Sequence, residues 1–306
     1  MYKKFFGLRE NPFNVNPDPR YLFTTPHTEE ALSCLTYGIQ TRKGFILLTG
    51  EVGTGKTTLI NKLMEWLRGS GISAAFIFNP RLTEEQFFDF MMMDFGISCD
   101  ARSKSQVLMR LNDWLLERYR LGETAVLVID EAQTLSYSVL EEIRLLTNFE
   151  TYTEKLLQIV LSGQPEMEAK LKRPDLRQLR QRITLRTKTH PLTLQETSGY
   201  VESRLRIAGC NGSPIFTSSA IEAIYRYSRG IPRVVNLLCE HALISAFADQ
   251  QKPVEGRVIE TVAGEFDLQQ GEQTEAPAPG IAGNDALLAE TIESIAILMD
   301  RLRRTD

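Results

Sequence analysis

The amino-acid sequence predicts an α/β fold, in which helices cover both faces of a five-stranded parallel sheet and an all-helical domain follows. Three observations support this prediction. Short apolar runs alternate with helical patterns over residues 1–190, as they do where each parallel strand is followed by a crossover helix. A glycine-rich loop separates the first apolar run from the helical pattern after it. Beyond Pro191 the chain shows helical patterns only.

The expected strands are short apolar runs, which is the pattern of strands that are buried on both faces. We predict strands at residues 44–49, 72–78, 125–129, 156–161 and 183–189. Helices are expected where apolar residues recur at spacings of three and four. In the α/β part they are predicted at residues 27–41, 57–67, 83–95, 104–120, 137–149, 165–172 and 174–181. In the helical part they are predicted at residues 195–208, 217–228, 232–248 and 255–266.

Changes in composition along the chain predict its domain organisation. Residues 1–26 are rich in proline, which interrupts helices, and in aromatics, which predict that this arm packs onto the domain. We therefore expect an α/β domain with its arm at residues 1–190 and a helical lid at residues 191–268. Residues 269–285 have the composition of a flexible linker. Residues 286–304 have heptad spacing, which predicts an amphipathic helix.

The overall composition is that of an ordinary globular protein, and it disfavours some classes of partner. The formal net charge of −4 and the pI of about 5.6 give no general attraction to nucleic acid or to anionic membranes. The four cysteines lack metal or redox spacing and indicate reduced thiols in the cytoplasm. Because no apolar run approaches the roughly 18–20 residues that span a bilayer, we expect no membrane span.

A complete phosphate-loop motif lies between the first strand and the first crossover helix. Residues 50–57 read Gly-Glu-Val-Gly-Thr-Gly-Lys-Thr and match G-x-x-x-x-G-K-[ST]. The glycines let backbone N–H groups approach phosphates, Lys56 supplies a cation, and the Thr57 hydroxyl is a ligand for Mg²⁺. The residues expected to bind the nucleotide in this loop are Gly50, Glu51, Val52, Gly53, Thr54, Gly55, Lys56, Thr57 and Thr58.

An acidic pair at the end of the third predicted strand completes this chemistry. The apolar run at residues 125–129 carries Asp130 to the edge of the sheet where the phosphate loop also lies, so Asp130 is predicted to hold Mg²⁺. Glu131 is predicted to polarise the attacking water. An adjacent Asp-Glu pair, and a sequence without the guanine-reading N-K-x-D motif, favour ATP over GTP. The expected cofactors are therefore ATP and Mg²⁺.

These motifs, with further segments, resemble the general secretion pathway protein A (ExeA-type) family of bacterial AAA+ ATPases. The additional segments are Phe-Phe-Gly-Leu-Arg-Glu-Asn-Pro-Phe in the arm, Asp130-Glu-Ala-Gln133, residues 144–150, residues 163–166 and Gly-Ile-Pro-Arg at residues 230–233. The resemblance covers about residues 1–266. It implies an ATPase that forms homo-oligomers with ATP and acts as a switch or motor for an envelope secretion, export or assembly system.

The resemblance to AAA+ proteins also implies roles for several polar residues. Gln164, with Ser162 as the competing candidate, would contact the γ-phosphate or the attacking water. Arg182, and after it Arg180, would be the arginine finger that reaches the nucleotide of a neighbouring subunit. Arg233 would contact the γ-phosphate from the lid.

The same resemblance sets expectations for partners and location. The member that defines the family continues into a transmembrane helix and a periplasmic peptidoglycan-binding domain, neither of which we find in this sequence. We expect a cytoplasmic protein, which reaches the inner membrane peripherally through a partner. The alternative function is a DNA-associated ATPase that is similar to transposition helpers. The low pI disfavours this alternative, and the basic residues 170–188 favour it.

Overall fold

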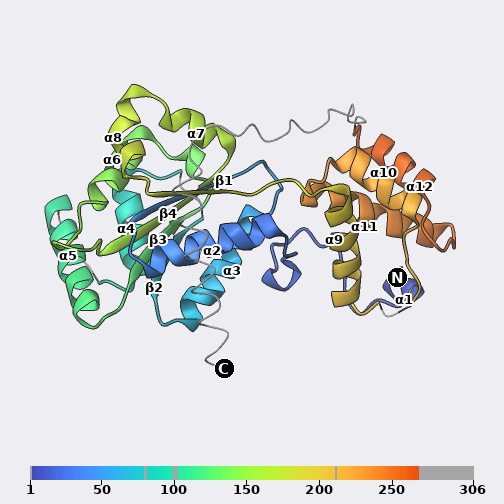
Figure 1. Cartoon of the computed structure of the whole chain (residues 1–306), viewed down its shortest axis with the longest axis horizontal. Coiled ribbons are helices and arrows are strands. Elements are labelled where there is room, and N and C mark those ends of the chain that lie inside the picture. The colour runs from blue at the N-terminus through green and yellow to red at the C-terminus, as the bar shows by residue number, and fades with distance from the viewer. Residues whose placement is uncertain (1, 79–80, 99–102, 211, 269–306) are drawn as a thin grey trace. The chain divides into compact units, whose positions relative to one another are not determined.

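The core of the α/β part is one parallel sheet, which confirms the predicted fold class. Its strands are β1 (Phe45–Thr49), β2 (Ser73–Ile77), β3 (Ala125–Ile129), β4 (Leu157–Gly163) and β5 (Leu185–Lys188). They are arranged in the order β2-β3-β4-β1-β5 (Figure 1). The computed structural model describes residues 2–78, 81–98, 103–210 and 212–268, which belong to one unit of the chain. Because all strands are parallel, the carboxyl ends of β1, β3 and β4 meet at one edge of the sheet.

Two hydrophobic cores cover the two faces of the sheet, because successive side chains of a strand point to opposite faces. In β1, Phe45 and Leu47 belong to one core, whereas Ile46 and Leu48 belong to the other. The first core is completed by α4 (Glu84–Asp94), α5 (Lys104–Arg120), α6 (Tyr137–Leu146), α7 (Pro165–Leu171), η3 (Pro174–Leu176) and α8 (Arg177–Arg182). The second core is completed by α2 (Pro26–Gln40) and α3 (Lys56–Gly69).

Element boundaries differ from the prediction where side chains cap the helices. The predicted helix at residues 137–149 ends earlier, because the Thr147 hydroxyl donates a 2.6 Å hydrogen bond to the Arg144 carbonyl and closes the last turn of α6. β4 extends beyond the predicted strand and includes Ser162 and Gly163. This extension brings Ser162 to the edge of the sheet where β3 ends.

Four helices follow the sheet and enclose a third hydrophobic core. They are α9 (Leu194–Ile207), α10 (Ser218–Ser228), α11 (Pro232–Ala248) and α12 (Gly256–Glu265). Local sequence explains where they begin. Thr193 and Glu196 form a capping box at the start of α9, the Thr217 side chain caps α10, and Pro232 occupies the first turn of α11.

The aromatic arm contributes several of its apolar side chains to this third core. It contains α1 (Tyr2–Phe6) and the short η1 (Pro19–Tyr21). Phe6, Leu8 and Phe13 are buried among residues of the four helices. The sequence predicts an arm that packs and groups it with the α/β domain, because aromatic residues predict packing without indicating the surface that they contact.

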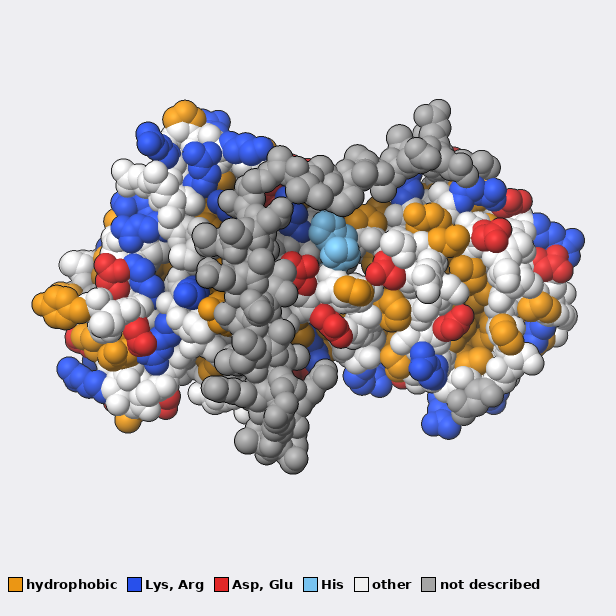
Figure 2. Space-filling view, in the orientation of Figure 1, with side chains coloured by type: hydrophobic (Ala, Val, Ile, Leu, Met, Phe, Trp, Pro, Cys, Tyr) orange, Lys and Arg blue, Asp and Glu red, His pale blue; other side chains and the backbone are white. Residues whose placement is uncertain are grey.

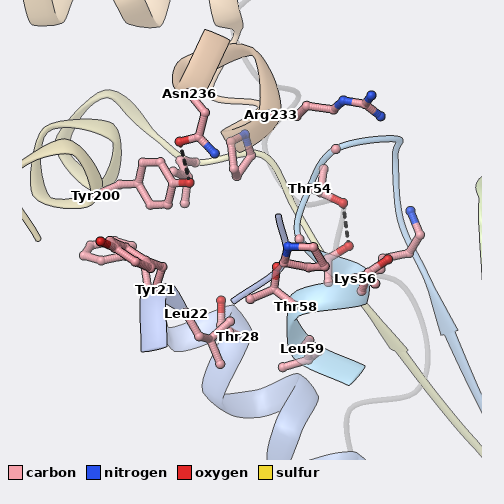
Figure 3. Close-up of a pocket in the computed structure, with 18 of the residues that line it drawn as sticks. Tyr21, Leu22, Thr28, Thr54, Lys56, Thr58, Leu59, Tyr200, Arg233 and Asn236 are labelled. Carbon is pink, nitrogen blue, oxygen red and sulfur yellow. Dashed lines mark hydrogen bonds between the residues drawn. The ribbon is translucent and has the colours of Figure 1, made fainter. Parts of the chain in front are cut away.

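A buried arginine ties the arm to the helices. Arg204 on α9 is 5% exposed, and its guanidinium donates hydrogen bonds to the carbonyl oxygens of Pro12 (2.5 Å) and Asn14 (3.2 Å) and to the Tyr200 hydroxyl (2.6 Å). The Tyr200 hydroxyl in turn donates to Asn236 Oδ1 at 2.9 Å (Figure 3). The guanidinium also lies over the Tyr21 ring, 4.5 Å from its centroid. This network holds residues 12–14 against α9.

The predicted linker at residues 269–285 and the predicted amphipathic helix at residues 286–304 lie outside the described residues. Across the part of the chain that the structure describes, none of the helices is both long enough and apolar enough to cross a bilayer.

Candidate nucleotide-binding site

The phosphate loop joins β1 to α3 and has the backbone that the motif requires. Gly53 and Gly55 adopt positive φ angles of 83° and 96°, which glycine reaches without strain. Gly50 is packed so tightly that a Cβ atom there would lie 2.0 Å from the Thr189 hydroxyl oxygen. The loop leads directly into α3, which begins at Lys56, so the helix N-terminus and the loop amides form an anion-binding cradle.

Lys56 is buried within this loop, with 6% of its surface exposed. Its ammonium group donates hydrogen bonds to the carbonyl oxygens of Gly50 (2.7 Å) and Glu51 (2.9 Å). Burial lowers the pKa of Lys56, and the negative charges of Glu131 and Asp130 oppose this shift. The loop therefore contains a cation close to the two carboxylates at the end of β3.

Asp130 is the centre of a small polar network at the end of β3. Its Oδ2 accepts a 3.0 Å hydrogen bond from the Thr57 hydroxyl, and its Oδ1 accepts bonds from the Ser162 hydroxyl (2.7 Å) and the Glu131 N–H (2.9 Å). A hydroxyl and a carboxylate oxygen on facing elements are the hard ligands that Mg²⁺ prefers. The donor set at Thr57 and Asp130 therefore fits the expected metal.

Glu131 follows in a left-handed backbone conformation, with φ of 53°, which is uncommon for a residue other than glycine. Its Oε2 accepts hydrogen bonds from Gln164 Nε2 (3.2 Å) and from Gln133 Nε2 (2.5 Å). Gln133 did not stand out as a site residue in the sequence, although it lies in the Asp-Glu-Ala-Gln segment that carried the family resemblance. The structure thus places both Gln164 and Gln133 against the predicted catalytic carboxylate.

The two candidates for the γ-phosphate contact at the end of β4 occupy different positions. Ser162 is fully buried against Asp130, whereas Gln164 lies at the pocket beside Glu131. Arg233 is the second residue of α11, and its backbone N–H donates a 3.2 Å hydrogen bond to the Gly53 carbonyl. Its exposed side chain extends above the phosphate loop in Figure 3. A Cβ atom on Gly53 would lie 2.8 Å from Arg233 Cβ, so this contact also requires a glycine.

A pocket of about 400 Å³ opens beside these residues and has one wall that the sequence did not reveal. The phosphate loop, Glu131 and Gln164 line one side, and Arg233 and Asn236 line another. The additional wall comes from the arm and the start of α2, whose lining residues are Val15, Asn16, Pro17, Asp18, Tyr21, Leu22, Phe23, Thr25, His27 and Thr28. Figure 3 shows Leu22 and Thr28 below the loop and Tyr21 below Tyr200.

The predicted arginine fingers do not line this pocket. Arg180 and Arg182 lie on α8, where Arg180 is exposed and Arg182 is half-buried. The structure thus assembles Lys56, Thr57, Glu131, Gln164 and Arg233 around one pocket and leaves the two arginines outside it.

A pair of histidines that are far apart in sequence meets at the rim of the pocket. The rings of His27 on α2 and His190 after β5 have centroids 4.8 Å apart, because α2 packs against β5. His190 is an exposed residue, yet partial burial, followed by the charges of His27 and Lys188, lowers its pKa. The neutral form of His190 is therefore favoured in the folded chain.

Acidification is expected to reduce stability slightly through His190. In the unfolded chain it titrates near its ordinary pKa of 6.5, whereas the folded chain protonates it only at lower pH. Its contribution to stability is therefore present above that value and is lost as the pH falls toward the folded pKa. Between about pH 7.5 and pH 5.5, we expect the melting temperature to fall further in wild type than in His190→Asn. Equal falls would contradict this prediction.

Comparison with known proteins agrees with this fold and this site. A family model described as an AAA domain matches residues 39–171. General secretion pathway protein A of Aeromonas hydrophila is 47% identical over 249 residues, which cover 81% of this chain and 45% of that protein. The chain thus spans less than half the length of this relative.

Solved structures resemble the chain in fold at low sequence identity. The origin recognition complex of Drosophila, solved bound to DNA, has a TM-score of 0.67 at 18% identity, covering 98% of this chain and 79% of that one. Cdc6p from Pyrobaculum aerophilum has a TM-score of 0.64 at 18% identity, covering 83% and 70%. From the phosphate loop, the Asp-Glu pair, the parallel sheet and these similarities, we conclude that the chain belongs to the AAA+ family of P-loop proteins, as a relative of general secretion pathway protein A.

Proposed function

We propose that the chain is a Mg²⁺-dependent ATPase that works as an oligomeric switch or motor for a bacterial secretion, export or assembly system. The observation that carries this proposal is the convergence of Lys56, the Thr57–Asp130 pair and Glu131 at one end of the sheet, beside a pocket. A cation, a set of hard oxygen ligands and a carboxylate beside the pocket are the groups that phosphoryl transfer to water requires.

Each residue has a distinct role in the proposed reaction. The loop amides and Lys56 bind the phosphates, and Thr57 and Asp130 would hold Mg²⁺, which neutralises charge on the β- and γ-phosphates when bound. Glu131 accepts a proton from the attacking water. Gln164 contacts the γ-phosphate or that water. Arg233 contacts the γ-phosphate and so couples the position of α11 to the bound nucleotide.

The arginines of α8 are proposed to act on a neighbouring subunit. Arg182 is the first candidate and Arg180 the second. Neither lines the pocket of its own chain, which supports a role across a subunit contact. An arginine supplied in this way stabilises the charge of the transition state, so hydrolysis would depend on assembly.

Steady-state ATPase activity, measured against protein concentration, tests the oligomeric switch. Specific activity is expected to rise with concentration in wild type, and Arg182→Ala is expected to lower the plateau by about 10³-fold. Arg177→Ala, at the other end of the same helix, is the matched control. Activity that does not depend on concentration and survives both Arg182→Ala and Arg180→Ala would refute a shared site.

The proposed pathway and location rest on the relationship to general secretion pathway protein A. We propose that the protein acts in the cytoplasm and meets the inner membrane peripherally through a component of the secretion or export machinery. Co-purification with inner-membrane fractions only when that machinery is present would support this location.

A DNA-associated ATPase is the second candidate, because a basic surface surrounds α8. Lys172, Arg177 and Arg180 are exposed, and Lys170 and Arg173 stack on the ring of Tyr137. Figure 2 shows Lys and Arg side chains gathered over the region of α7 and α8. Binding to a labelled duplex that weakens steeply with salt would favour this candidate, and ATPase activity without such binding would favour the first.

A further inference from the structure

Gln133 connects two parts of the site through the two ends of its side-chain amide. It lies in η2 (Ala132–Thr134), directly after Glu131 and Ala132. Its Nε2 donates a 2.5 Å hydrogen bond to Glu131 Oε2, and its Oε1 accepts a 3.1 Å hydrogen bond from the backbone N–H of Gln164. One side chain therefore links the carboxylate after β3 to the loop after β4.

The position of Gln133 is restrained by its surroundings. Its backbone carbonyl accepts a 3.1 Å hydrogen bond from Lys170 Nζ on α7. Gly163 at the end of β4 leaves just enough room for the amide, since a Cβ atom there would lie 3.1 Å from Gln133 Oε1. The half-buried side chain is thus held between η2, β4 and α7.

The two carboxylate oxygens of Glu131 differ in the hydrogen bonds that they accept. The amides of Gln133 and Gln164 both donate to Oε2. Among the residues that the structure describes, Oε1 has no hydrogen-bond partner. A general base must keep one oxygen free to accept the proton of the attacking water. This asymmetry leaves Oε1 as the oxygen that can do so.

We infer that Gln133 is a positioning residue that holds the Glu131 carboxylate with Oε1 toward the attacking water, while its other end is fixed by the backbone of Gln164. This inference rests on the proposed ATPase function and deepens it. The carboxylate of Glu131 sits at the end of several rotatable bonds, so with only the 3.2 Å hydrogen bond from Gln164 Nε2 left, it would also sample orientations in which Oε1 does not face the water. Misplacement of a catalytic group by about 1 Å can cost roughly 10²-fold in rate.

Two substitutions test whether Gln133 acts by positioning Glu131 or only by connecting η2 to the Gln164 backbone. Gln133→Glu has nearly the same shape and keeps the oxygen that accepts from Gln164, but it loses the donor to Glu131. Gln133→Met loses both the donor and the acceptor. Because Gln133→Glu also places a second carboxylate against Glu131, the positioning role predicts that it is at least as slow as Gln133→Met, whereas a bridge that acts only through the Gln164 amide predicts that it is faster than Gln133→Met. Gln195→Met, an exposed residue on α9, is the matched control.

The experiment measures kcat and KM for ATP with the full chain, and melting temperatures confirm that each variant is folded. Both Gln133 variants are expected to lower kcat roughly 10- to 100-fold, with KM within about threefold of wild type. Combining Gln133→Met with Glu131→Gln should lower kcat no further than Glu131→Gln alone, because residues that act through one group are not additive.

Three outcomes would overturn the inference. Wild-type kcat in Gln133→Met or Gln133→Glu contradicts it directly. A double variant whose loss equals the product of the two single losses shows that Gln133 acts independently of Glu131. An inactive wild-type chain would instead overturn the proposed ATPase function, and with it this inference, so the two failures can be told apart.

Discussion

Glu131→Gln is expected to lower kcat for ATP hydrolysis by roughly 10²- to 10⁴-fold, the usual contribution of a general base, while ATP binding stays close to wild type. The amide has nearly the shape of the carboxylate but accepts no proton from water. Lys56 and the phosphate loop, which are expected to supply most of the binding energy, are left intact. Single-turnover hydrolysis and equilibrium binding of a fluorescent ATP analogue separate the two effects.

A matched control for this substitution is Glu85→Gln, an exposed carboxylate on α4 that lies outside the pocket. It should hydrolyse ATP at the wild-type rate. If Glu131→Gln hydrolyses ATP within about threefold of wild type, Glu131 is not the base, and the assignment of the Asp-Glu pair is wrong. If it loses ATP binding as well, Glu131 contributes to the ground-state complex instead.

Arg204→Met is expected to lower the free energy of unfolding by about 2–4 kcal/mol. The substitution leaves the carbonyl oxygens of Pro12 and Asn14 without their donor in a buried setting, and it removes the cation that lies against Tyr21 and Tyr200. Methionine fills a similar volume, so the loss reports the hydrogen bonds and not a cavity. Urea unfolding at constant slope measures this change.

Arg206→Met is the control, because Arg206 lies two residues further along the same helix and is exposed. Its effect should stay within about 0.5 kcal/mol, as is usual for surface substitutions. A similar loss in both variants would mean that the helix, and not the buried network, is sensitive to change. An unchanged Arg204→Met would show that the contact between the arm and α9 contributes little to stability.

Local patterns were sufficient to predict most of the fold. The spacing of apolar residues predicts the strands and helices, and the spacing of glycines predicts the phosphate loop. Both patterns depend only on residues that are neighbours in the chain. The same holds for Asp130 and Glu131, which follow a buried strand directly.

The features that the sequence did not reveal depend on contacts between distant segments. Gln133 contacts Gln164 only because β3 and β4 are neighbours in the sheet. No local sequence pattern predicts the order of the strands. His27 and His190 meet because α2 packs on β5. The arm's role as a wall of the pocket depends in the same way on Arg204, which lies about 190 residues further along the chain.

The burial of the arm among α9 to α12 also bears on how the protein is made. Phe6, Leu8 and Phe13 leave the ribosome long before the residues beyond 250 that complete the core around them. At translation rates of about 5–20 residues per second, these apolar side chains wait on the order of ten seconds to a minute for their partners. During synthesis the nascent chain therefore carries an exposed apolar segment of the kind that chaperones bind, and the arm reaches its native surroundings only after α12 has been made.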